Sequence, residues 1–286
     1  MRAVTRLISA ELFKVRKRSM TTILLAIMIG IIVVLYLILL AISNVSLPGG
    51  QRAGNIQTLL GLPGALPFAL AMMATFGSAL AVVLAASMMG NEYNWRTIRT
   101  MLISSESRSK LIAAKLVTVI VYMLIGLVIG MAAGFLMSLL TTAIGGYQFD
   151  FSFFTGAYAW DQFLQFWRTF YIMLPYVLLA FLFAVIGRSA MPGIAVGIGV
   201  FFLEGIITTL MRTAGGWVAS VPDYLINANF AAINQLNDLP GQIGGAFGGG
   251  NLSMPSVVHA AVTLAVYIVV FVAAAFYTFN KRDVTV

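Results

Sequence analysis

The sequence has no cysteine and a single histidine, His259, and both shortages exclude whole classes of chemistry. Without cysteine there is no disulfide, no thiolate nucleophile and no thiol ligand for a metal. A Ser/His/Asp triad would have to use His259, and no Gly-x-Ser-x-Gly motif accompanies it. The phosphate-binding motif GxxxxGK(S/T) is also absent. We therefore expect a chain that is not an enzyme, binds no metal or cofactor and does not itself hydrolyse ATP.

Charge is scarce as well, and long apolar runs replace it. Charged residues make up 9% of the chain and hydrophobic ones 60%, against about 25% and 45–50% in soluble domains. A helix needs about 20 residues to cross a hydrocarbon layer of about 30 Å. Six runs are long enough, which predicts an all-α integral membrane domain over residues 1–286: Met20–Ile42, Pro67–Met89, Leu116–Leu140, Phe166–Ile186, Met191–Met211 and Val257–Phe279.

The basic residues predict how these spans are oriented. Of the 17 Lys and Arg residues, all but Arg52, Arg168 and Arg212 fall on the side of the first residues when the chain is threaded through a bilayer. Basic residues near span ends favour the cytoplasmic side, so we expect both termini in the cytoplasm. The net charge of +8 then suits contact with anionic lipid headgroups and gives no reason to expect nucleic acid.

Two segments on the predicted cytoplasmic side stand out. In Val4–Lys17 apolar residues recur at steps of three and four, which predicts an amphipathic helix along the headgroup layer, an orientation signal, or both. The polar stretch Gly90–Lys115 is much longer than the ~2–8 residues that join adjacent helices. It predicts a short helix broken by Ser104–Ser109, where a serine caps the next helix. Its aromatic residue Trp95, which stands among charged residues, favours a docking surface. The alternative is a loop that only anchors the spans.

The segments expected on the other side are poor in charge. Ser43–Leu66 and Thr141–Gln165 are predicted to be glycine-rich connections, and the aromatic residues of Gly145–Trp160 resemble an interfacial belt. Within the long segment Arg212–Ser256, Val221–Leu236 is mildly amphipathic, which predicts a short helix across the outer mouth.

Small residues inside the spans predict close helix packing. Gly126, Gly130 and Gly134 form one row, and Gly193 and Gly197 form another. Four-residue spacing of small side chains lets backbones approach closely in lipid, either within one chain or between two copies. Two prolines predict further features. Pro175 predicts a kink or a helix start in the fourth span, and Pro192 predicts the start of the fifth span.

Glu204 is the one acid inside a predicted span. It shares a helical face with Gly197 and Thr208, so it should point into the protein or a water-filled cavity. Its depth is close to that of His259, and we hypothesise a contact between the two. The two residues are either a polar feature of a translocation path or a proton-linked switch. The alternative, which we favour, is that Glu204 is a protonated acid hydrogen-bonded between helices and that His259 is an ordinary interfacial side chain.

The polar stretch also carries a family resemblance. Glu92 followed by Arg96-Thr97, then Ser107-Arg108 and Ala114-Lys115, resembles the signature between spans two and three of type-2 ABC-transporter permeases. The segments Glu11-Leu12-Phe13-Lys14 with Arg16, and Val221-Pro222-Asp223-Tyr224-Leu225, are similar to parts of the same family. Arg96 stands where glycine is frequent in the family, and Ser105 and Glu106 stand where proline is frequent.

The resemblance implies a six-helix exporter subunit of the bacterial plasma membrane. It implies a homodimer with a second permease copy, contact with membrane lipid, and two copies of a separate ABC ATPase subunit that bind ATP and magnesium. Residues 1–19 would contain an elbow helix, residues 90–110 the coupling segment and residues 212–256 an outer gate. The residues implied for coupling are Glu92, Tyr93, Trp95, Arg96, Arg99 and Arg108. Those implied for the elbow are Glu11, Phe13, Lys14 and Arg16, and those for the path or gate are Glu204, Thr208, Pro222, Tyr224 and His259.

Two other functions remain open on the sequence. A secondary transporter or channel driven by an ion gradient would use Glu204 as its carrier, although such proteins usually hold more intramembrane charges and inverted repeats. A membrane anchor or assembly subunit would need no translocation path at all.

Overall fold

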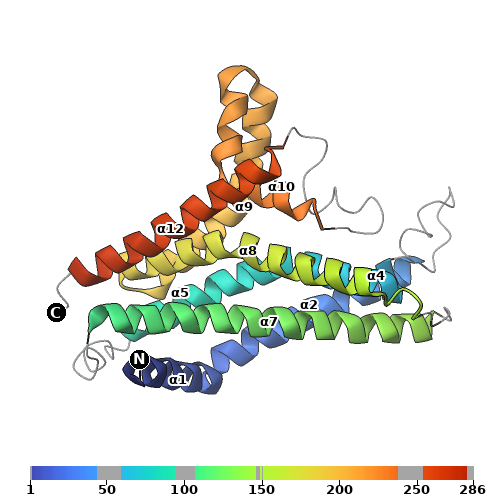
Figure 1. Cartoon of the computed structure of the whole chain (residues 1–286), viewed down its shortest axis with the longest axis horizontal. Coiled ribbons are helices and arrows are strands. Elements are labelled where there is room, and N and C mark those ends of the chain that lie inside the picture. Colours follow the sequence, from blue (N-terminus) through green and yellow to red (C-terminus); the bar gives the residue numbers. More distant parts are fainter. Residues whose placement is uncertain are drawn as a thin grey trace.

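The computed structural model describes residues 2–43, 59–94, 107–145, 149, 151–237 and 254–281, and within them the chain is helical without strands. The side chains of residues 2–4 are not described. Figure 1 shows long helices running side by side along one axis. Their bounds are α1 Arg2–Lys17, α2 Ser19–Ser43, α4 Leu62–Met72, the π-helical turn η1 Met73–Gly77, α5 Ser78–Asn94, α7 Arg108–Ile144, α8 Gly156–Gly187, α9 Ala190–Ala214, the 3-10 helix η2 Gly216–Tyr224, α10 Ile226–Asn234 and α12 Val257–Lys281.

The six predicted spans are confirmed as helices that are long and apolar enough to cross a membrane. They are α2, the continuous run of α4, η1 and α5, and then α7, α8, α9 and α12. The protein is therefore a multi-pass helical membrane protein. Two boundaries were wrong. The connection expected up to Leu66 is shorter because α4 begins at Leu62, and the one expected up to Gln165 is shorter because α8 begins at Gly156, with Thr155 as its N-cap. Asp161 and two glutamines interrupt the apolar run there without interrupting the helix.

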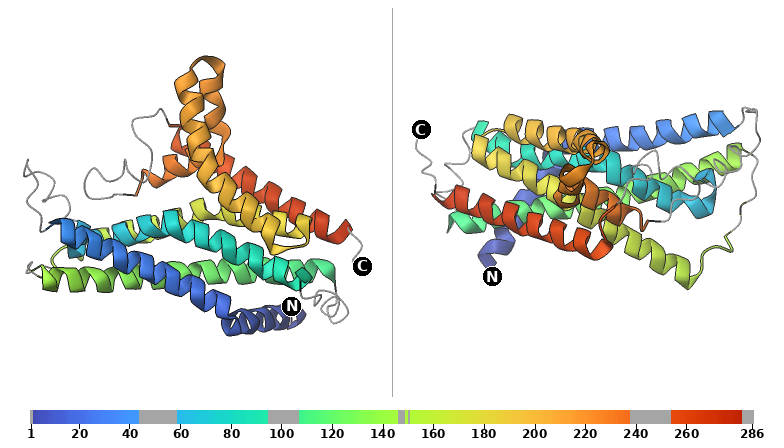
Figure 2. Two further views of the ribbon diagram at one scale, coloured as in Figure 1. Left: turned by 180° about the vertical axis from the view of Figure 1, so that it is seen from behind. Right: turned by 90° about the horizontal axis from the view of Figure 1, so that it is seen from above.

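Both described ends of the chain lie at the same end of the bundle, which Figures 1 and 2 show from three sides. We call this the inner end and the opposite one the outer end. At the inner end, α1 packs along the first half of α7. Towards the outer end, α9 leaves the bundle at an angle, and η2 runs back along its last turns. The helix expected within Val221–Leu236 is present as the end of η2 followed by α10.

The spans differ in how much of them the protein itself covers. Within α4–α5 and within α8, 67% of the most apolar stretch is buried, against 17% in α9 and 11% in α12. Large side chains that pack the centre include Tyr36, Tyr176 and Phe181. The apolar surface that remains on α2, α9 and α12 must contact lipid or another chain, because exposing it to water would cost free energy.

Glycine positions explain how closely the central helices pack. A Cβ added at Gly134 would stand 2.3 Å from the Cβ of Ala69, and one at Gly193 would stand 2.5 Å from the carbonyl oxygen of Ala180. Gly197 is similarly close to Val82. The two glycine rows therefore mark contacts of α7 with α4 and of α9 with α5 and α8, as the spacing predicted. Gly126 differs, since no atom lies within 4 Å of its added Cβ.

The two prolines lie at different places in their helices. Pro192 is in the first turn of α9, as expected, where its missing N–H has no helical partner to lose. Pro175 lies inside α8, which continues through it as one helix.

Candidate functional site

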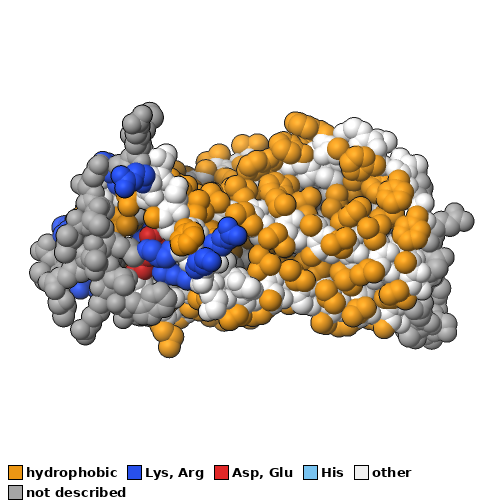
Figure 3. Space-filling view, turned by 90° about the horizontal axis from the view of Figure 1, so that it is seen from below, with side chains coloured by type: hydrophobic (Ala, Val, Ile, Leu, Met, Phe, Trp, Pro, Cys, Tyr) orange, Lys and Arg blue, Asp and Glu red, His pale blue; other side chains and the backbone are white. Residues whose placement is uncertain are grey.

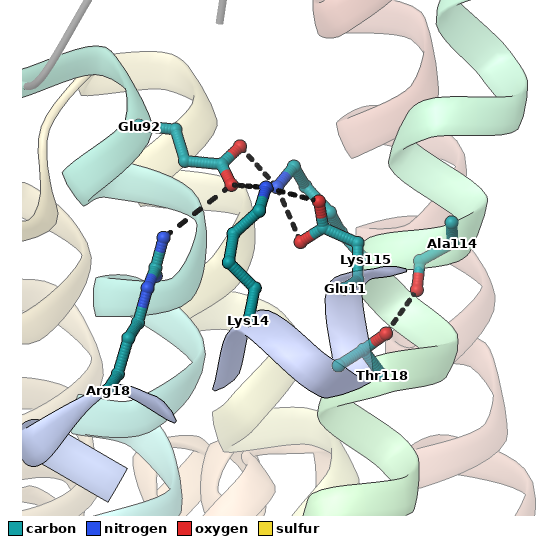
Figure 4. A network of polar contacts seen from close by, with 7 residues as sticks. All are labelled: Glu11, Lys14, Arg18, Glu92, Ala114, Lys115 and Thr118. Carbon is teal, nitrogen blue, oxygen red and sulfur yellow. Dashed lines mark hydrogen bonds and ion pairs between the residues drawn. The ribbon is translucent and has the colours of Figure 1, made fainter. Parts of the chain in front are cut away.

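An ionic cluster of five side chains lies at the inner end: Glu11, Lys14, Arg18, Glu92 and Lys115. The residues come from α1, the single-residue link between α1 and α2, α5 and α7. Figure 4 shows the two carboxylates pointing toward the ammonium group of Lys115, with Lys14 and Arg18 approaching from the α1 side. The cluster thus joins three helices that are far apart in the sequence.

Local sequence explains why these side chains converge. Glu11 and Lys14 lie one turn apart on the face of α1 that buries Val15, and Arg18 follows Lys14 by four residues, directly after the helix. Glu92 lies in the last turn of α5, and Lys115 lies two turns after the N-cap of α7. That N-cap is Ser107, whose hydroxyl accepts a hydrogen bond from the Lys110 amide at 3.3 Å, so the predicted serine cap is confirmed.

The distances define a connected network. Lys115 Nζ lies 3.1 Å from a Glu11 carboxylate oxygen and also pairs directly with Glu92. Lys14 Nζ bridges the same two acids, at 2.8 Å from Glu11 and 3.4 Å from Glu92. Arg18 lies 3.7 Å from Glu92. Glu92 therefore has three cations within reach.

Burial makes this pairing necessary. The side chains of Glu92 and Lys115 are both 0% exposed, whereas that of Lys14 is 36% exposed. A buried charge without a partner costs several kcal/mol, roughly, so each acid needs its cations. Burial alone would raise the pKa of Glu11, but the positive charges of Lys115 and Lys14 outweigh it and hold the pKa below its ordinary value of 4.5.

The residues implied for ATPase coupling separate into three groups. Glu92 is inside the protein and Tyr93 packs against the core, so neither forms an exposed surface. Arg108 is at the inner end, where its guanidinium donates to the Asn280 carbonyl of α12 at 3.4 Å. Trp95, Arg96 and Arg99 lie outside the described residues.

The residues implied for an elbow helix lie on opposite faces of α1. Glu11 and Lys14 face inward, to the ionic cluster. Phe13 is 64% exposed, with the ammonium of Lys17 5.9 Å from its ring, and Arg16 is exposed. Helix α1 therefore joins a charged inner face to a partly apolar outer one, which is the pattern of a helix at a membrane surface.

At the outer end, Glu204 connects α9 to α8 and α10. Its carboxylate accepts hydrogen bonds from the Ile226 amide at 2.6 Å and from the Tyr176 hydroxyl at 3.2 Å, and it also bonds the Asn227 backbone. These amides belong to the first turn of α10, where helix N–H groups have no partner within the helix. Glu204 thus caps α10 from a neighbouring helix, because its oxygens accept amides that have no partner within α10.

The hypothesised contact between Glu204 and His259 is not formed. His259 Nε2 lies 2.9 Å from the Asp223 carbonyl oxygen, and its ring meets the ring of Tyr224 edge-on. Both residues bind the η2–α10 segment, but at different points along it. The estimate of similar depth gave the wrong partner, because depth in the membrane says nothing about position around the bundle.

The rest of the predicted gate holds the same segment in place. Asp223 pairs with Arg212 at 2.9 Å, and the Tyr267 hydroxyl donates to the Tyr224 carbonyl at 2.9 Å. Pro222 is buried, and its carbonyl accepts the Leu225 amide at 3.0 Å. Thr208 is buried one turn from Glu204, as its helical spacing predicted.

Sequence reasoning did not assign Lys115, Arg18 or Tyr176 to a site. The sequence did contain a signal for Lys115: it is a single charged residue between the apolar residues 111–114 and the apolar run that begins at Leu116. No local pattern identifies Tyr176 as the partner of Glu204. Across the described part of the chain, no group of three His, Cys, Asp or Glu side chains could hold a metal ion.

The chain belongs to a family described as "Protein of unknown function (DUF2705)", whose profile matches residues 57–285. A curated relative, "Uncharacterized protein YhcI" of Bacillus subtilis (strain 168), is 26% identical over 214 residues. The match covers 71% of this chain and 63% of the relative, so it spans slightly less than two thirds of that protein's length. The family match includes Glu92 and Lys115 and leaves α1 outside it.

Proposed function

We propose that this chain is the membrane-spanning subunit of an ATP-driven exporter of the ABC type. Its inner end would face the cytoplasm of a bacterial cell and meet two separate ATPase subunits through residues 90–110. The observation that carries the proposal is the ionic cluster, because Glu92 and Lys115 stand on either side of the polar segment 95–106 and pair with each other.

The ionic cluster supplies what a coupling segment needs, a firm connection to the spans. A force applied to residues 95–106 would reach α5 through Glu92 and α7 through Lys115. The same two side chains pair with α1 through Lys14 and Glu11. Movement of a segment anchored in this way would move the three helices together. A loop that merely links two spans would not need a buried charge network.

The apolar surface of α9 supports a second copy of the chain as a partner. Where α9 leaves the bundle, Phe202, Leu203, Ile206 and Leu210 are exposed, and Trp217 of η2 is exposed beside them. Figure 1 and the left view of Figure 2 show this part projecting away from the other helices. A second copy packed there would cover it, and we propose a homodimer that encloses the translocation path.

The contacts of Glu204 favour this function over a carrier driven by an ion gradient. An ion carrier must release its ligand and become accessible to water, while Glu204 is buried and bound to the first turn of α10. We therefore assign Glu204 a structural role at the outer end. An anchor subunit without a path would not require residues 95–106 to be tied to three helices.

Reversing the charge of Arg96 tests the proposal. The chain and its proposed ATPase partner are reconstituted in nanodiscs, and ATP hydrolysis and ATPase retention are measured. We expect Arg96→Glu to lose most of the stimulated hydrolysis and of the bound ATPase, because it places a repelling charge in the middle of the docking segment.

The matched control is Lys281→Glu, which makes the same charge change at the inner end but outside the segment. It should retain the ATPase and its stimulated hydrolysis. Equal behaviour of the two variants, or an ATPase that never associates with the chain, would contradict the proposed function.

A further inference from the structure

An apolar groove opens on the side of the bundle between α2, α5 and α7. It has a volume of about 100 Å³ and is lined almost entirely by apolar side chains, the exceptions being Thr21 and Tyr122. Leu25 and Met28 form the α2 wall, and Ile125 at the rim of the α7 wall is exposed to the surroundings of the bundle. The groove therefore faces the hydrocarbon layer when the six helices span a membrane.

Small residues create the groove. The side chain of Met73, at the start of the π-helical turn, covers Gly130 and Gly77 and forms the floor. Gly126 lies one turn before Gly130, and a Cβ there would meet no protein atom within 4 Å. In this row of glycines, Gly130 and Gly134 hold two helices together, whereas Gly126 leaves space that the protein does not fill.

The groove has the length of a lipid tail segment. It runs along α2 from Thr21 to Ile29 and along α7 from Tyr122 to Gly130, which is roughly 12 Å in each helix at 1.5 Å per residue. One leaflet contributes about half of a hydrocarbon core of about 30 Å. The groove thus follows most of the depth of the leaflet at the inner end.

Positive charge lies where the groove reaches the inner end. The Tyr122 hydroxyl donates to the Leu12 carbonyl of α1 at 3.1 Å, and the Thr21 amide donates to the Arg18 carbonyl at 3.2 Å. The last turn of α1 is thereby fixed beside this end, with exposed Arg16 and Lys17 on it. Figure 3 shows Lys and Arg side chains gathered toward one end of this face, and hydrophobic side chains over most of the remainder.

We propose that the groove binds one acyl chain of an anionic phospholipid whose phosphate contacts Arg16 and Lys17. The apolar walls take up the chain, and the basic turn of α1 selects the headgroup, since each such residue near the surface attracts anionic lipid. The bound lipid would join α1 to α2, α5 and α7 at the level just below the ionic cluster. This inference does not depend on the proposed function, because it concerns the chain and its membrane alone.

Native mass spectrometry of the full chain in detergent tests the inference, with phosphatidylglycerol and phosphatidylcholine as probes. We expect one phosphatidylglycerol per chain to bind in preference to phosphatidylcholine. Gly126→Leu should weaken phosphatidylglycerol binding about tenfold, as losing contact with about two methylene groups would. Gly30→Leu is the matched control, because Gly30 also has no atom within 4 Å of an added Cβ but does not line the groove.

A second pair of variants separates the headgroup from the chain. Arg16→Gln with Lys17→Gln should reduce the preference for phosphatidylglycerol while leaving phosphatidylcholine binding unchanged. If Gly126→Leu fails to fold, Leu25→Phe narrows the groove from the α2 wall and should give the same loss. Equal effects of Gly126→Leu and Gly30→Leu, no preference between the two lipids, or displacement by inorganic phosphate alone would overturn the inference.

Discussion

The inner and outer ends of the bundle both bury carboxylates, but they stabilise them by different means. At the inner end Glu11 and Glu92 face three cationic side chains. Lys14 and Lys115 each pair with both acids, and Arg18 pairs with Glu92. At the outer end Glu204 faces a hydroxyl and the backbone amides of a single helix turn. The carboxylates at the inner end are stabilised by the charge of their neighbours, and the one at the outer end by hydrogen-bond donors held in fixed positions.

This difference teaches what each end can do without losing its stability. Glu92 has Lys14, Arg18 and Lys115 nearby on flexible side chains, so a small displacement of α1, α5 or α7 still leaves it paired. Glu204 has no such choice, because the Ile226 amide is fixed in the backbone of α10. We therefore expect the inner end to tolerate movement and the outer end to hold one geometry.

The largest effect should come from Lys115→Met. This change removes the fully buried one of the two cations that both acids share. It leaves Glu11 with Lys14, and Glu92 with Lys14 and Arg18, which are more exposed. Breaking a buried ion pair from one side costs about 3–5 kcal/mol. We expect a marked drop in the midpoint of thermal unfolding in detergent.

Lys281→Met is the control for this prediction, since Lys281 is exposed and donates to the Tyr277 hydroxyl one turn earlier on the same helix. It should unfold at the temperature of the unmodified chain. Combining Lys115→Met with Glu92→Gln should recover part of the loss, because the acid left without its partner is neutralised. Unchanged unfolding of Lys115→Met would show that the inner end does not depend on charge.

A smaller effect is expected from Glu204→Ala at the outer end. It leaves the Ile226 amide and the Tyr176 hydroxyl buried without an acceptor, at a cost of about 1–3 kcal/mol. Glu204→Gln keeps one acceptor oxygen for the amide and should cost less. Hydrogen exchange of α10 amides measures this directly, and exchange should rise in the alanine variant before it rises elsewhere.

The order of the two variants is the informative result. If Glu204→Gln destabilises the chain as much as Glu204→Ala, the carboxylate charge is what matters at the outer end. The two ends would then be alike, and the comparison between them would fail.

The sequence predicts the spans well and the ionic cluster poorly, for one physical reason. Span position depends on a continuous apolar run, which is a local property, and so does the cap formed by Ser107. The pairing of Glu92 with Lys14 joins residues 78 positions apart, and that of Lys115 with Glu11 joins residues 104 positions apart. Such pairs depend on how α1 packs against α5 and α7, and no local pattern in the sequence records that packing.

The beginning of α8 shows a related limit. Residues 156–165 were expected in a connection because Asp161, Gln162 and Gln165 lower their apolar character. In the folded chain Gln162 and Gln165 are buried against neighbouring helices, and Gln165 donates to the Pro67 carbonyl at 3.5 Å. A polar side chain with a partner inside the protein does not end a helix, although it ends an apolar run.

The smallest expected effect is a dependence of stability on pH that passes through Glu11. The pKa of Glu11 in the folded chain is lower than its ordinary value of 4.5, because Lys115 and Lys14 outweigh the effect of burial. Its contribution to stability is therefore complete above pH 4.5 and is lost as the pH falls through the lowered folded-state pKa. Glu11→Gln cannot titrate, so the unmodified chain should exceed it in unfolding temperature at neutral pH by more than it does in acid. Thermal unfolding of both chains in detergent over a pH series measures the gap, and a gap that stays constant down to strongly acidic pH would remove Glu11 from the charge-dependent side of the comparison.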